Sequence, residues 1–94
     1  MEALNIQKVL SERGQRYGTF YACANTVQQL KELLDTHRRA ADTGLEADQA
    51  EALDMICHKM ARIINGDPNY ADSWADIAGY ATLVADRLFT GEKK

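Results

Sequence analysis

Four acidic side chains occur at helical spacings that suit a divalent cation. Glu51 and Asp54 are three residues apart, and Asp72 and Asp76 are four residues apart. Residues at these spacings lie on the same side of a helix, so each pair shares one side. Mg²⁺ prefers oxygen ligands, and carboxylates that converge from neighbouring helices would hold it. On this hypothesis Asp54, Asp72 and Asp76 are metal ligands, and Glu51 orients an attacking water.

The same acids also have a structural interpretation. Asp72 with Ser73 forms a good N-cap pair, and acidic residues in a first helical turn complement the helix dipole. Glu51 and Asp54 could be solvated charges that pair with basic neighbours on their own helix. Asp54 and Asp76 would share an ion only if the two helices are offset, or if a second subunit contributes one pair.

Basic and aromatic residues offer the chemistry of phosphate binding. Lys59 and Arg62 are three residues apart on the expected third helix. Arg13, Arg16 and Tyr17 fall in the segment SERGQRYG, whose two glycines indicate a loop. Arginine presents a planar donor fork to phosphate, and tyrosine presents an aromatic ring to a base. These five residues are candidate phosphate or nucleotide ligands, and surface charges with a packed tyrosine are the alternative.

The apolar residues predict an all-α domain. They recur at helical spacing over residues 3–11, 19–40, 46–64 and 72–89. No alternating strand pattern and no internal repeat appears. Gly66 and Pro68 end the third helix within a short turn, so the third and fourth helices should form an antiparallel hairpin that brings Asp76 near Met60 or Lys59. We expect one domain over residues 1–94, with a short first helix and three long helices.

Two of the expected helices carry a clear apolar side. On the third helix the expected buried positions are Leu53, Ile56, Cys57, Met60, Ile63 and Ile64. On the fourth helix they are Trp74, Ile77, Ala78, Ala81, Val84, Ala85 and Leu88. Gly79, among many alanines, costs about 1 kcal/mol relative to alanine in a helix interior. Close packing on a neighbouring helix is the preferred explanation, with a second subunit or a ligand as alternatives.

Composition narrows the class of protein. The 94 residues are 46% hydrophobic and 27% charged, as in a folded domain, and the formal charge of −3 gives no general attraction to a nucleic acid duplex. No segment approaches the roughly 20 apolar residues that cross a bilayer, and the N-terminus lacks the features of a secretion signal. Cys23 and Cys57 fit reduced core thiols. We expect a cytoplasmic protein with no membrane partner.

Three segments carry a family resemblance: ERGQRYGTF near the start, EALDMICHKMARIINGDPNYADSW in the middle and DIAGYATLVADRL near the end. They cover nearly the whole chain, and they resemble a family of small, mostly phage- and prophage-borne proteins of unknown function. That family is similar, more distantly, to the all-α nucleoside triphosphate pyrophosphatases of the MazG type. The resemblance implies a helical bundle, a dimer or tetramer, and Mg²⁺ held by acidic pairs on adjacent helices.

Carried over residue by residue, Glu51 and Asp54 resemble one half of such an acidic set, and Asp72 and Asp76 resemble the other half. The MazG-type enzymes usually show ExxE followed by ExxD, whereas this chain has ExxD followed by DxxxD. An inherited fold is therefore better supported than inherited catalysis.

Two functional hypotheses follow. The first is a MazG-like nucleotide-binding protein or Mg²⁺-dependent nucleoside triphosphate pyrophosphohydrolase, in which Lys59 and Arg62 neutralise charge on phosphate. The second is a non-catalytic phage accessory protein that binds a nucleotide signal or a host protein. A homo-oligomer is expected in both, because a domain this small and rich in alanine would complete its core in a dimer or tetramer.

Overall fold

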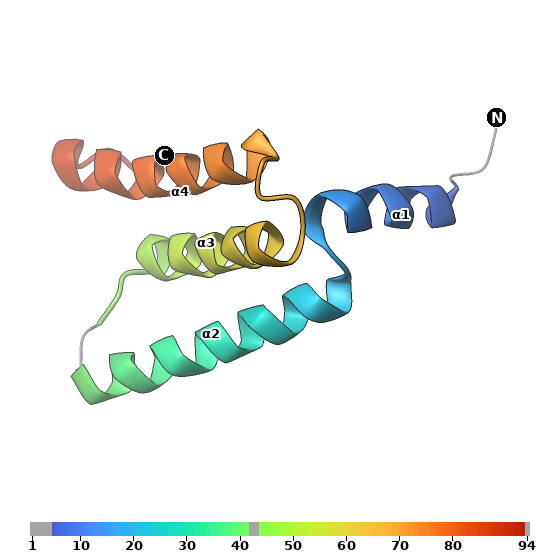
Figure 1. The fold of residues 1–94 in the computed structure, drawn as a ribbon. Helices are drawn as coiled ribbons and strands as arrows, with labels where there is room; N and C mark the ends of the chain where they lie inside the picture. Colours follow the sequence, from blue (N-terminus) through green and yellow to red (C-terminus); the bar gives the residue numbers. More distant parts are fainter. Residues whose placement is uncertain (1–4, 42–43, 94) are drawn as a thin grey trace.

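The computed structural model describes residues 5–41 and 44–93, which form four α-helices (Figure 1). They are α1 (Ile6–Tyr17), α2 (Phe20–Ala41), α3 (Ala47–Asn65) and α4 (Ala71–Thr90). No strand occurs in these two ranges, so the all-α prediction is confirmed. The bounds of α2, α3 and α4 lie within one residue of those expected. None of the helices, over the residues described, is long and apolar enough to span a membrane.

The three long helices form an open layer with α3 in the middle (Figure 1). α3 contacts α2 on one side and α4 on the other, and α2 and α4 do not touch each other in the described residues. α1 projects past the end of α3, where it contacts α2 and α3. Because the layer is one helix thick, much of each helix surface has no neighbour within the chain.

The expected antiparallel hairpin of α3 and α4 is confirmed. Lys59 Nζ on α3 lies 3.0 Å from Asp76 Oδ2 on α4. At the other end of the hairpin, the Arg87 guanidinium in the last turn of α4 binds Glu46 and Asp48 at the start of α3. These ion pairs join the end of one helix to the beginning of the other, as antiparallel packing requires.

The first helix differs from the prediction at its C-terminal end. The loop expected over SERGQRYG is helical, and α1 continues to Tyr17 with Gly14 in its interior. One interior glycine weakens a helix by only about 1 kcal/mol, which contacts with the rest of the chain outweigh. The chain turns at Gly18, whose φ of 80° favours glycine. Residues 3 and 4 of the expected helix lie outside the described residues.

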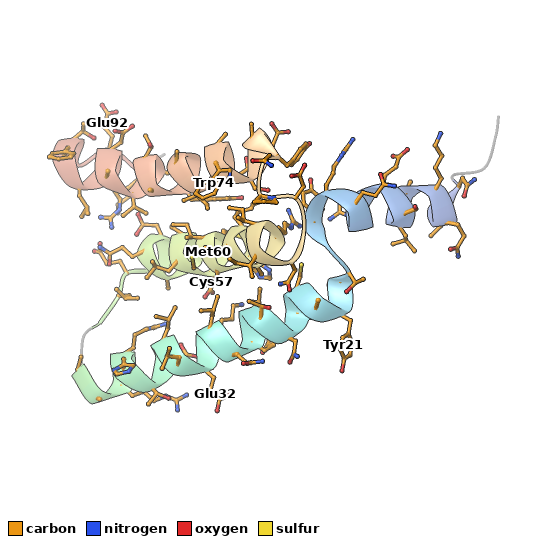
Figure 2. All side chains as sticks on the ribbon, viewed as in Figure 1. Tyr21, Glu32, Cys57, Met60, Trp74 and Glu92 are labelled. Carbon is orange, nitrogen blue, oxygen red and sulfur yellow. The ribbon has the colours of Figure 1, made fainter. Side chains whose placement is uncertain are left out.

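The core is small and lies on both sides of α3. The buried apolar residues are Val27, Ala52, Cys57, Ala61 and Ile63. Figure 2 shows Cys57 on the side of α3 that faces α2. Several residues expected in the core are instead exposed, namely Leu53, Met60, Ile64, Trp74 and Leu88. The prediction was wrong for them because the single layer of described helices covers only part of the apolar side of each helix. Leu53, for example, lines a pocket between α3 and α2 and is still 44% exposed.

Candidate functional site

Three arginines and two tyrosines from separate parts of the chain gather at the C-terminal end of α3. We call Arg13, Arg16, Tyr17, Arg62 and Tyr70 the Arg/Tyr cluster. The Cζ atoms of Arg62 and Arg13 lie 4.5 and 5.1 Å from the centre of the Tyr17 ring. Arg16 Cζ lies 5.3 Å from the centre of the Tyr70 ring. The two rings meet edge to face with their centroids 5.8 Å apart, so the five side chains form one continuous stack of cation–π and aromatic contacts.

A close crossing of two backbone segments positions this cluster. The Asp67 N–H donates to the Arg16 carbonyl oxygen at 2.8 Å, which joins the loop after α3 to the end of α1. A Cβ atom added at Gly18 would lie 2.2 Å from the carbonyl oxygen of Asn65. One added at Gly66 would lie 2.3 Å from the carbonyl carbon of the last residue of α1. Glycine at both positions therefore permits an approach that any side chain would block.

The arginines of the cluster carry charge that no described carboxylate neutralises. Arg13, Arg16 and Arg62 form no ion pair in the described part of the chain, whereas three other basic side chains do. Burial is the main cause that lowers the pKa of the neighbouring His58, and the charges of Lys31 and Arg62 add to it. A local excess of positive charge on a chain of net charge −3 is the electrostatic signature of an anion site.

A pocket of about 290 Å³ opens beside Tyr17. Arg13 and Arg62 supply its charged wall, and apolar side chains, including Leu10 and Phe20, supply the rest. The Cys23 thiol, also in the wall, donates to the Tyr17 carbonyl oxygen at 3.0 Å. Burial raises the pKa of this thiol despite the nearby Arg62, so the sulfur is a neutral part of the pocket.

The two acidic candidates on α4 have partners of their own. Asp76 forms the ion pair with Lys59. Asp72 accepts a hydrogen bond from the Tyr70 hydroxyl at 3.0 Å, and this bond raises the pKa of Tyr70. Neither Asp72 nor Ser73 is the N-cap residue, because α4 begins one residue earlier with Tyr70 in the N-cap position. Lys59, expected among the phosphate ligands, is buried against α4 and does not join the Arg/Tyr cluster.

The two acidic candidates on α3 point to opposite neighbours. Glu51 lines a pocket of about 510 Å³ against α4, together with Tyr80 and Arg87. Asp54 lines a separate pocket of about 330 Å³ against α2, together with Lys31. Because α3 lies between α2 and α4, Glu51 and Asp54 fall at different interfaces although they are only three residues apart. Within the described residues no three His, Cys, Asp or Glu side chains form a group that could hold a metal ion. The donor set of one chain does not fit a shared Mg²⁺.

Two features of the site region were missed from the sequence. The first is Tyr70, which completes the cluster. The sequence did offer a signal for it: the loop over residues 66–70 is short, so Tyr70 must stay close to Arg62. The Arg87 ion pairs with Glu46 and Asp48 were also missed, although antiparallel pairing brings the last turn of α4 to the first turn of α3. These pairs neutralise the arginine of the larger pocket, which makes that pocket less suited to an anion than the smaller one.

Comparison with known proteins places the chain in one family. Neither the curated proteins nor the solved structures contain a match to this sequence. The sequence profile of one family, described as a domain of unknown function (DUF6378), matches residues 3–88 and thus includes all five residues of the Arg/Tyr cluster. The chain therefore belongs to the DUF6378 family.

Proposed function

We propose that this protein binds a phosphate-bearing nucleotide, or a signal derived from one, at the Arg/Tyr cluster. The observation that carries the proposal is the gathering, on two tyrosine rings, of three guanidinium groups that form no ion pair with any described residue. The planar fork of arginine matches two phosphate oxygens at once. A bound phosphate would also relieve the mutual repulsion of three positive charges held close together.

The surroundings favour a nucleotide over a bare anion. The pocket beside Tyr17, about 290 Å³ in volume, is at the lower end of the ~300–1,000 Å³ range of ligand sites, which suits one nucleotide unit. Leu10 and Phe20 offer apolar contact to a base, and guanidinium planes stack on bases as well. Cation–π contacts already restrain the arginine side chains, so binding requires less ordering of them.

Binding without turnover is the form of this function that the geometry favours. The resemblance to MazG-type enzymes implies Mg²⁺-dependent cleavage, for which acidic side chains must converge. In one chain Asp76 is paired with Lys59, and Glu51 and Asp54 face different helices. Nucleotide binding needs only the Arg/Tyr cluster and its pocket.

Calorimetric titration tests the proposal with nucleoside mono- and triphosphates, cyclic nucleotides and the matching nucleosides, each in Mg²⁺ and in EDTA. We expect phosphate-bearing compounds to bind, nucleosides to fail, and the affinity to be the same in both buffers. Arg62→Gln should weaken binding at least tenfold, because a hydrogen bond to a charged group contributes about 1.5–3 kcal/mol. Arg39→Gln removes the same charge from the exposed end of α2 and should leave the affinity unchanged.

Three outcomes would contradict the proposal. No heat and no thermal shift with any nucleotide at millimolar concentration would exclude binding. Equal weakening by Arg62→Gln and Arg39→Gln would show general charge attraction in place of a site. Release of pyrophosphate in Mg²⁺, lost in Asp76→Asn, would replace binding with hydrolysis.

A further inference from the structure

One side of α4 carries an apolar stripe that the described residues leave largely exposed. The stripe has the 4-3-4-3 spacing of a helix–helix seam and consists of Trp74, Ala78, Ala81, Ala85 and Leu88. It lies beside the α3-facing side of α4 and is separate from it. Trp74 is 55% exposed and Leu88 is 60% exposed, and within the described residues α4 contacts no helix other than α3. Among the described helices, no second helix packs closely on these small residues as expected.

The surface area of the chain shows how much contact is absent. The solvent-accessible surface is 7182 Å², whereas a compact monomer of 10.5 kDa would expose about 5,400 Å². The radius of gyration is 16.0 Å, against about 12 Å for a compact domain of this length. This excess of about 1,800 Å² is spread over all four helices, since Leu10, Phe20 and Leu33 are exposed as well, and the stripe on α4 is one part of it.

Trp74 is prepared for such an interface. Its indole Nε1–H donates to the Pro68 carbonyl oxygen at 2.8 Å, which fixes the orientation of the exposed ring. Figure 2 shows Trp74 near the start of α4 and Glu92 just beyond its C-terminal end. A tryptophan held in place before binding loses little side-chain freedom on association, and tryptophan is a frequent anchor of interfaces.

The pattern of side-chain sizes identifies the partner. The stripe reads large, small, small, small, large in both directions, with Ala81 at its centre. A two-fold interface must be complementary to itself, and a palindromic stripe meets that condition when the helices run antiparallel. Trp74 of one copy then lies beside Leu88 of the partner, and the three alanines allow the helix axes to approach to about 8 Å. The stripe covers 15 residues, and its first and last residues are about 21 Å apart along the helix.

We propose that two copies of this chain pair through α4, antiparallel, along the stripe centred on Ala81. Sedimentation velocity from 1 to 100 µM should give twice the 10.5 kDa mass of one chain. Ala81→Glu places two carboxylates near the two-fold axis and should weaken the dimer at least 100-fold. Gly79→Glu, on the same helix but outside the stripe and with open space around the Cα, is the matched control and should remain dimeric.

A charge-swap experiment covers the case in which Ala81→Glu fails to fold. An equimolar mixture of Ala81→Glu and Ala81→Lys should recover the two-chain mass and the helical circular dichroism, because opposite charges then meet at the axis. Disulfide formation between the two chains reports the orientation of the helices. If the helices are antiparallel, Ala78→Cys mixed with Ala85→Cys should form a disulfide between the two variants. If they are parallel, each variant would instead form a disulfide with another copy of itself. A single-chain mass for the wild type at 100 µM, or a mixture that stays monomeric, would overturn the proposal.

Discussion

Gly18 and Gly66 are the residues on which the geometry of the Arg/Tyr cluster depends. They lie where the end of α1 crosses the end of α3, and a Cβ atom at either would overlap backbone atoms. We expect Gly18→Ala to lower the free energy of unfolding by roughly 2–3 kcal/mol, because it adds left-handed strain to this clash.

Gly14→Ala is the internal comparison for this prediction. Gly14 lies inside α1 with nothing within 4 Å of an added Cβ, so the substitution should raise the free energy of unfolding by roughly 0.5–1 kcal/mol. Urea unfolding monitored by circular dichroism measures both. Equal effects of the two substitutions would mean that the backbones do not cross as described.

A second prediction concerns Asp76. If Asp76 is the counter-ion of Lys59, its loss should change stability equally with and without Mg²⁺, whereas the loss of a metal ligand should matter only in Mg²⁺. Lys59 is buried and Asp76 is half-exposed, so Asp76→Asn should lower the free energy of unfolding by roughly 1–2 kcal/mol, less than for a fully buried pair. The loss should be the same in Mg²⁺ and in EDTA. It should shrink in a Lys59→Met background, where no ammonium group is left unpaired. A loss that appears only in Mg²⁺ would instead support the metal ligand.

Among the elements, the helices were predictable where one helix could be judged alone. The bounds of α2, α3 and α4 follow from caps and apolar period: Thr19 accepts a hydrogen bond from the Ala22 N–H, and Gly66 follows the last residue of α3. The end of α1 was not predictable, because contacts made by Tyr17 across the molecule outweigh the local preference of Gly14. The association of Arg13 with Arg62 likewise depends on where α1 crosses α3, which no spacing in the sequence encodes.

The interface of α2 and α3 should make stability depend on pH through His58. Burial and the positive charges of Lys31, Arg62 and Lys59 lower the pKa of His58 from its ordinary value of 6.5, and Asp54 opposes them. The unfolded chain therefore binds this proton more tightly than the folded chain. Well above pH 6.5 the histidine is neutral in both the folded and the unfolded chain, and it then has no effect on stability.

As the pH falls below 6.5 toward the lowered pKa of His58, the free energy of unfolding should decrease. Urea unfolding at pH 7.5, 6.5 and 5.5 measures the decrease, which should be smaller in His58→Gln. Lys31→Gln removes one of the responsible charges and should also reduce it, whereas Lys8→Gln, on α1, should not. A decrease of wild-type size in His58→Gln would assign it to other groups.

At the scale of the whole molecule, the sequence contains more apolar surface than one chain can bury. The chain extends over 47 × 30 × 27 Å, and its helices form a single layer with a small core. The apolar positions of α3 and α4 are those that the sequence pattern indicated. The pattern does not tell which of these apolar residues contact another helix of the same chain and which would contact a second copy. Both kinds of contact use the same types of side chain.

This division has a thermodynamic consequence that requires no variant to observe. If folding and pairing are coupled, the thermal midpoint must rise with protein concentration, since unfolding releases two chains from one dimer. For two chains of 94 residues, each tenfold increase in concentration should raise the midpoint by about 4 °C. Scanning calorimetry at 5, 50 and 500 µM measures the shift, and Ala81→Glu should show none. A wild-type midpoint that is constant over this range would mean that the single layer is stable alone, and the stripe on α4 would then have no part in folding.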